Sequence, residues 1–288
     1  MQEIRHYHNN RYMKWSQKFS IARVLRLEPF ITNKKPTHKN AWVAKMEGRK
    51  GLRGGAVLLA DNPIQGMKGI YKLTVEVTDR CIASYVGMSM MMQQEKSVEE
   101  RVALHGLSIM GRPLNTEASK LINQNHMLKD REAARLWFCS QDFQCYQALH
   151  TEFFRGPVNQ LSKKAQVARI IIEKGITNFA LQEKFWNSKL HIQVFPVGIS
   201  DDYELNLSAI KLLESIALLE DRLFQKKKRI ELNTVDEAAP DILSKKIDNF
   251  KKNYLATQSK NNFSSLFKFL SEIQILKIAR AQKNLIDS

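Results

Sequence analysis

Apolar residues spaced alternately four and three positions apart mark the C-terminal third of the chain and constrain its fold more than any other feature. Two runs keep this spacing, at Leu205, Ala209, Leu212, Ile216, Leu219 and Leu223 and at Leu243, Ile247, Phe250 and Tyr254. Residues spaced in this way lie on one face of an α-helix. A third helix is indicated by Phe263, Phe267, Leu270, Ile273 and Leu276. The sequence therefore predicts that residues 203–288 pack as an antiparallel helical hairpin or a three-helix bundle.

A period of two residues marks strands in the N-terminal third. In YKLTVEVT, residues 71–78, apolar side chains alternate with polar ones, as a half-buried β-strand requires. The apolar run AVLLA, residues 56–60, is followed by DNP and is typical of a buried strand that ends in a turn. The segment CIASYVGMSMMM, which begins at Cys81, could supply a further strand. We therefore expect a small antiparallel or mixed sheet in this part of the chain.

Helical signals dominate from residue 97 to about residue 175. Ser97 and Glu100 have the spacing of a capping box, and further helices are indicated at 116–126, 130–138, 141–154 and 161–174. KLHIQVF, which Pro196 closes, is a lone strand candidate. The predicted fold class is α+β, with a basic α+β region at 1–95, a helical middle region at 96–200 packed on it, and the C-terminal helices at 203–288.

Positive charge is concentrated near the N-terminus. The chain has a formal net charge of +16, and residues 1–53 hold seven Lys and six Arg against three Glu, which is +10. The remaining 235 residues therefore carry only +6. A basic segment of this kind indicates an acidic partner, and nucleic acid is the first candidate because its phosphates attract Lys and Arg.

The segment RHYHNNRYMKW, residues 5–15, combines cations with aromatic rings. Tyr7, Tyr12 and Trp15 could stack on unpaired bases, or they could be core residues fringed by cations. Both interpretations are open from the sequence alone. The predicted binding residues are Arg5, Arg11, Lys14, Trp15, Lys34, Lys35, Arg49, Lys50 and Arg53.

Histidines and cysteines indicate neither a metal site nor a disulfide framework. His6 and His8 have the spacing of two ligands on one face of a strand, but no third ligand is identifiable, so no metal is predicted. Three cysteines are an odd number spread over a long chain, which favours free thiols in a reducing compartment. The sequence also lacks an apolar run long enough to span a membrane, and a cytoplasmic location is expected.

An enzymatic alternative comes from the segment GGAVLLADNPIQGMKGIYKLTVEV, residues 54–77, preceded by IRHYHNN, residues 4–10. This order resembles the ADP-ribosyltransferases, in which a first strand carries an Arg or His that contacts NAD. His8 is followed by Asn9, where such enzymes usually carry Gly. The triplet QQE at residues 93–95 has the Gln-x-Glu form of some members. The resemblance implies NAD as cofactor, with Arg5, His8 and Glu95 as the catalytic residues.

A third alternative is an interaction protein, such as a bacterial effector that acts in the cytosol of a host. Residues 14–27 are predicted to form a short helix capped by Ser16, because Trp15, Phe19 and Ala22 have helical spacing. Its basic stretch 15–27 could lie on anionic lipid, while the C-terminal helices bind a host protein.

Overall fold

The computed structural model describes residues 11–27, 56–90, 97–109, 167, 179–224, 228–233, 236–257, 261–272 and 275–287. Its strands are β1 (Phe19–Ser20), β2 (Leu25–Leu27), β3 (Ala56–Leu58), β4 (Gly69–Thr78), β5 (Cys81–Ser89), β6 (Leu190–Pro196) and β7 (Lys228–Glu231). Its α-helices are α2 (Val98–Ile109), α7 (Phe179–Lys189), α8 (Tyr203–Phe224), α9 (Pro240–Ala256), α10 (Ser264–Glu272) and α11 (Ile275–Asp287). Two 3-10 turns are η1 (Ile21–Arg23) and η4 (Asn261–Phe263).

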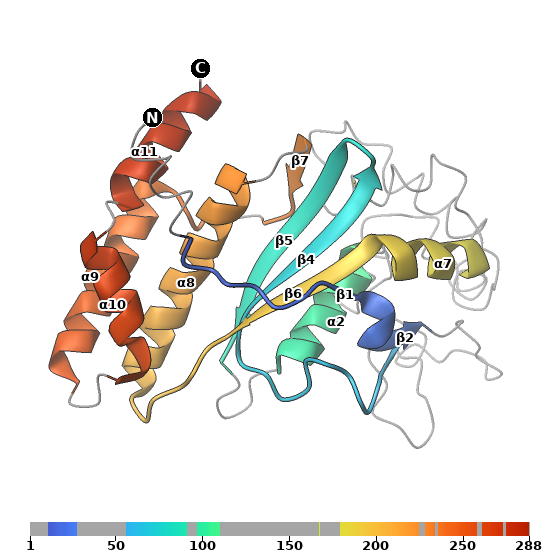
Figure 1. Ribbon diagram of the computed structural model, residues 1–288, viewed down its shortest axis with the longest axis horizontal. Helices are drawn as coiled ribbons and strands as arrows, with labels where there is room; N and C mark the ends of the chain where they lie inside the picture. Colours follow the sequence, from blue (N-terminus) through green and yellow to red (C-terminus); the bar gives the residue numbers. More distant parts are fainter. Residues whose placement is uncertain are drawn as a thin grey trace, which may run out of the picture.

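Within these residues one mixed sheet has the strand order β1-β6-β4-β5-β7 (Figure 1). The long hairpin β4–β5 forms its centre, β6 pairs antiparallel with β4, and β7 pairs parallel with β5. β2 and β3 form a separate antiparallel pair. The main sheet thus takes strands from each of the three regions expected from the sequence.

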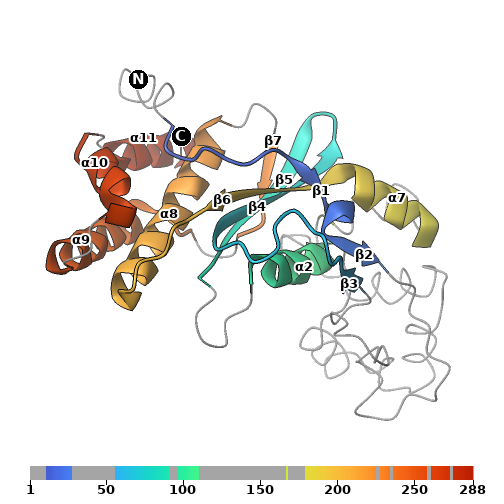
Figure 2. The same ribbon diagram turned by 60° about the horizontal axis from the view of Figure 1, so that its bottom comes forward.

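The sheet separates two hydrophobic cores. On one face, Ile70 and Val86 pack against α8, and α9, α10 and α11 lie beyond α8 on the side away from the sheet (Figures 1 and 2). On the other face, Tyr71, Leu73 and side chains of β6 pack against α2 and α7. The alternation of β4 side chains between the two faces is what keeps the cores apart.

The strand and cap predictions are confirmed. Tyr71, Leu73 and Val75 are fully buried on one face of β4, and the segments from Ala56, Cys81 and Leu190 are all strands. The Ser97 hydroxyl accepts from the Glu100 backbone N–H at 3.2 Å, while Glu100 accepts from the Ser97 N–H at 3.0 Å. This reciprocal capping box begins α2. The helices expected at 116–126, 130–138, 141–154 and 161–174 lie almost wholly outside the described residues.

The two longest apolar runs also form the helices that they predict. α8 buries the six positions spaced four and three apart, except that Leu223 is half-buried, and α9 buries Leu243, Ile247, Phe250 and Tyr254. α8 and α9 pack against each other in antiparallel directions. Asn253, near the end of α9, donates to the Glu204 carbonyl at the start of α8. The single helix predicted for the third run is not seen: Phe263 lies in η4, Phe267 and Leu270 lie in α10, and Leu276 lies in α11. Ile273 lies outside the described residues. The fold class is α+β, as predicted.

The helix predicted at residues 14–27 is wrong. This segment is extended as far as β1, makes one 3-10 turn at η1, and continues as β2. The Ser16 hydroxyl accepts from the Val194 N–H, and the Ser16 N–H donates to the Val194 carbonyl, so Ser16 extends the edge of β6. Pairing with a strand far away in sequence outweighs the local helical spacing, which neglects such partners.

Candidate functional site

Residues 11–18, which we call the N-terminal strap, run from beside α8 along β6 to β1 at the edge of the sheet (Figure 2). The carboxylate of Glu220, on α8 and only 3% exposed, accepts from the backbone N–H of Tyr12 at 2.8 Å and from that of Met13 at 3.3 Å. A charged acceptor makes these hydrogen bonds stronger than neutral ones. Two hydrogen bonds therefore hold the start of the strap against α8.

The aromatic rings of the strap are part of the fold. The Tyr12 ring lies between Phe195 of β6 and Phe269 of α10, with ring centroids 6.0 and 4.7 Å away. The Trp15 ring is half-buried beneath the Lys72 ammonium, which lies 4.8 Å from its centroid. Of the two interpretations of these rings, the structure favours core packing for Tyr12 and Trp15.

The strap turns cations outward. Arg11 and Lys14 are exposed, whereas Met13 between them is buried. The Arg11 guanidinium lies 3.8 Å from the centroid of the Phe224 ring, the last residue of α8. A guanidinium on an aromatic face keeps its charge available to solvent on its other side. The other predicted binding cations, Arg5, Lys34, Lys35, Arg49, Lys50 and Arg53, lie outside the described residues.

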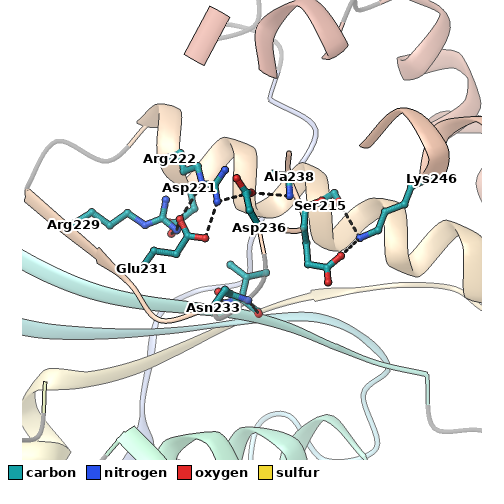
Figure 3. A network of polar contacts seen from close by, with 11 residues as sticks. Ser215, Asp221, Arg222, Arg229, Glu231, Asn233, Asp236, Ala238 and Lys246 are labelled. Atoms are coloured by element: carbon teal, nitrogen blue, oxygen red, sulfur yellow. Dashed lines mark hydrogen bonds and ion pairs between the residues drawn. The ribbon is translucent and has the colours of Figure 1, made fainter. Parts of the chain in front are cut away.

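A cluster of ion pairs joins α8, β5 and β7 (Figure 3). Asp221, whose side chain is 4% exposed, accepts from the Ser84 hydroxyl at 2.7 Å and pairs with Arg229 at 3.1 Å and Lys72 at 3.5 Å. Arg229 also donates to the Ser84 oxygen at 2.9 Å. Three strands and one helix are thus tied together through one carboxylate.

A second guanidinium completes this ion network. Arg222 donates through two nitrogens to both Glu231 oxygens, at 2.9 and 2.7 Å, and pairs with Asp236 at 2.7 Å. Burial acts to lower the pKa of Arg222, but the bonds from Glu231 and Asp236 outweigh it and raise the pKa. Beyond β7, the Asn233 amide accepts from the Val86 N–H and donates to the Val86 carbonyl, as a strand residue would.

The charges of this network balance, because three carboxylates face three cations. The Ser84 hydroxyl donates a hydrogen bond to Asp221 and accepts one from Arg229, and neither partner is a histidine that could act as a base. The arrangement therefore suits a structural clamp that holds β7 against β5, and it offers no unmatched charge for a substrate.

Perturbed ionisable groups gather elsewhere, around β5. Tyr85 contacts His105 of α2, with 3.1 Å between the phenol oxygen and Nε2 and 4.3 Å between ring centroids, and Tyr71 lies beside them. Burial raises the pKa of Tyr85 to about 12, and the nearby Glu214 charge adds to the rise. Burial also raises the pKa of Glu214, on α8, to about 7. The sequence does not predict this cluster, because its residues lie on β4, β5, α2 and α8 and are brought together only by the fold.

This cluster has the perturbed pKa values typical of active sites, but Tyr71 is fully buried and so out of reach of a substrate in this structure. Among the described residues there is no group of three or more His, Cys, Asp or Glu side chains placed to hold a metal. The alternative catalytic residues Arg5, His8 and Glu95 lie outside the described ranges. The helices of the described ranges include none that is both long enough and apolar enough to cross a membrane.

Comparisons with protein-family models, with curated proteins and with solved structures found no match for this chain.

Proposed function

We propose that this protein binds an acidic partner, and that the partner is nucleic acid, through the basic N-terminal segment that the strap anchors. The observation that carries the proposal is the orientation of the strap. Its rings and its backbone N–H groups engage the core, while Arg11 and Lys14, two of the 13 cations of residues 1–53, face solvent. The strap thus holds these two cations at one place on the folded surface.

Charge location supports this proposal over an enzymatic one. The ion network of α8, β5 and β7 is neutral, because its carboxylates and cations pair with one another. By contrast, residues 1–53 hold 13 cations and only three carboxylates, so most of their positive charge is not balanced within the segment. Phosphate contacts made by such cations supply most of sequence-independent binding to nucleic acid.

The test is fluorescence anisotropy with a labelled oligonucleotide at low salt. The variant changes Lys34, Lys35, Arg49 and Lys50 to Glu, which lowers the net charge by eight units without changing a residue of the strap. We expect binding to fall by more than about a hundredfold, because each reversed cation loses an attraction and adds a repulsion. Wild-type affinity in this variant, with an unchanged circular-dichroism spectrum, would overturn the proposal.

A further inference from the structure

The second concentration of positive charge lies at the other end of the chain. Residues 240–288 hold nine Lys and Arg against four Asp and Glu, a net charge of +5, whereas residues 54–239 hold 23 against 22. Fifteen of the sixteen net charges therefore belong to the two ends of the sequence. Composition alone does not say whether the two ends meet.

The strap brings the first described residues of the chain next to the C-terminal helices. Tyr12 packs on Phe269 of α10, and its hydroxyl lies 3.2 Å from the Ser265 oxygen. Arg11, one residue earlier, covers the end of α8 at Phe224. The strap therefore begins beside the helices that carry the C-terminal cations. Residues 28–55, which hold seven of the N-terminal cations, connect β2 to β3, and these two strands lie at the other end of the molecule from α9, α10 and α11 (Figures 1 and 2).

These helices turn their cations away from the core. α9, α10 and α11 bury apolar side chains against α8, so their polar faces form the outer layer on that side of the molecule (Figures 1 and 2). The exposed cations of this layer are Lys245, Lys252, Lys268, Lys277, Arg280 and Lys283. Its exposed carboxylates, among the side chains that the structure describes, are Asp241 and Asp248, both on α9.

These cations are closely spaced along their helices. Lys245 and Lys252 are seven residues apart on α9, which places them on one face about 10 Å from each other. Lys277, Arg280 and Lys283 follow one another at intervals of three residues, or about 4.5 Å along the axis of α11. Duplex DNA carries one negative charge per about 1.7 Å of its axis, so several of these cations can be neutralised at once.

Aromatic platforms for unpaired bases are scarce on this surface. Phe250, Tyr254, Phe263 and Phe269 are all buried, and Phe267 is half-buried with its ring stacked on Tyr254 at 4.4 Å. The large apolar side chains exposed within the described ranges are Leu181, Tyr203 and Leu255, of which only one is aromatic. Binding to single strands depends on stacking, whereas binding to a duplex backbone depends on charge density.

We infer that the outer faces of α9, α10 and α11 are a second half of the binding surface and that the ligand is a nucleic-acid duplex held through its phosphates. The inference rests on the proposed function, since it adds a cationic face beside Arg11 and Tyr12 to the N-terminal cations that bind the same ligand. It adds the identity of the folded contact residues and the preference for duplex over single strand.

The test compares two variants that each lose four exposed cations. One changes Lys245, Lys252, Arg280 and Lys283 to Gln, and its matched control changes Arg80, Lys184, Lys211 and Lys228 to Gln, all exposed in the charge-balanced region 54–239. Anisotropy with a labelled duplex and with one of its strands, at several salt concentrations, gives the slope of log affinity against log salt. Circular dichroism establishes that both variants remain folded.

The first variant should bind the duplex at least about tenfold more weakly at 0.1 M salt, with a slope shallower by about 3. The control should stay within about threefold of the wild type, and the wild type should prefer the duplex to the single strand. Equal weakening of both variants would overturn the assignment of the surface, and tighter binding to the single strand would overturn the preference for duplex. Either result leaves the N-terminal proposal standing, provided that the Lys34, Lys35, Arg49 and Lys50 variant still loses binding.

Anionic membrane is a competing ligand for the same cations. Flotation of the same two variants with vesicles of phosphatidylserine and phosphatidylcholine distinguishes a lipid ligand from a nucleic-acid ligand. The inference expects flotation to be equal for both variants. Loss of flotation in the first variant, with its duplex affinity unchanged, would assign the surface to lipid instead.

Discussion

Replacement of Asp221 by Ala should destabilise the protein more than any exposed substitution, because Asp221 links Ser84, Arg229 and Lys72 inside the fold. Its side chain is 4% exposed and that of Arg229 is 11% exposed. Removing one partner of a buried ion pair leaves an uncompensated charge and costs about 3 to 5 kcal/mol. For a chain of this size, this is a fall in melting temperature of about 6 to 20 °C.

A double variant distinguishes the cost of an unpaired buried charge from the cost of lost side-chain packing. Asp221→Leu combined with Arg229→Met removes both charges and fills their space, while Glu231 keeps its bidentate partner Arg222. Lys72, with a side chain 15% exposed, can turn toward water. We expect this variant to recover most of the lost stability, because paired removal of buried charges is often neutral.

The assay is thermal unfolding followed by circular dichroism, with Lys18→Met as the control. Lys18 pairs with Glu76 at 3.0 Å, but their side chains are 42% and 29% exposed, so its loss should cost less than about 1 kcal/mol. The reasoning is refuted if Asp221→Ala melts within about 2 °C of the wild type. It is refuted as well if the double variant melts below the single one.

Other predictions concern pH, backbone geometry and the strap. The raised pKa of Glu214 means that the folded protein holds this proton more tightly than the unfolded chain does. The free energy of unfolding should therefore fall by about 2 to 3 kcal/mol as pH rises from about 4.5 to about 7. In urea titrations, the free energy of unfolding of Glu214→Gln should exceed that of the wild type at pH 8 and equal it at pH 4. Gly69 has φ +136° and its added Cβ would collide with the Phe195 carbonyl oxygen, so Gly69→Ala should lower the melting temperature more than Gly66→Ala, where φ is +68° and the space is open. Tyr12→Ala should cost about 2 to 4 kcal/mol, whereas Tyr12→Phe, which keeps the ring, should cost less than about 1 in the same melting assay.

Much of the fold could be predicted because its signals are local. The alternation in β4 and the apolar stripes of α8 and α9 report which side chains are buried, and the capping box of α2 lies within four residues. Such patterns depend only on the period of a strand or helix. They say that elements exist, but not which elements pair.

The rest depends on partners that are distant in sequence. Trp15 and Phe19 have helical spacing, yet the segment is extended because Ser16 and Phe19 pair with β6, more than 170 residues away. β7 is a short basic segment without alternation, and its place beside β5 follows from the Asp221 and Arg229 contacts. The contact of Tyr12 with Phe269 of α10 has no local signal either.

The salt dependence of duplex binding tests the central claim most directly. Anisotropy of a labelled duplex, titrated with wild-type protein between about 50 and 300 mM salt, gives the number of phosphates neutralised from the slope of log affinity against log salt. The two basic ends predict a slope of about −5 or steeper, because each contacted phosphate contributes about 0.9. A shallow slope with weak binding at every salt concentration would contradict the claim and would mean that the charge of +16 serves a different partner.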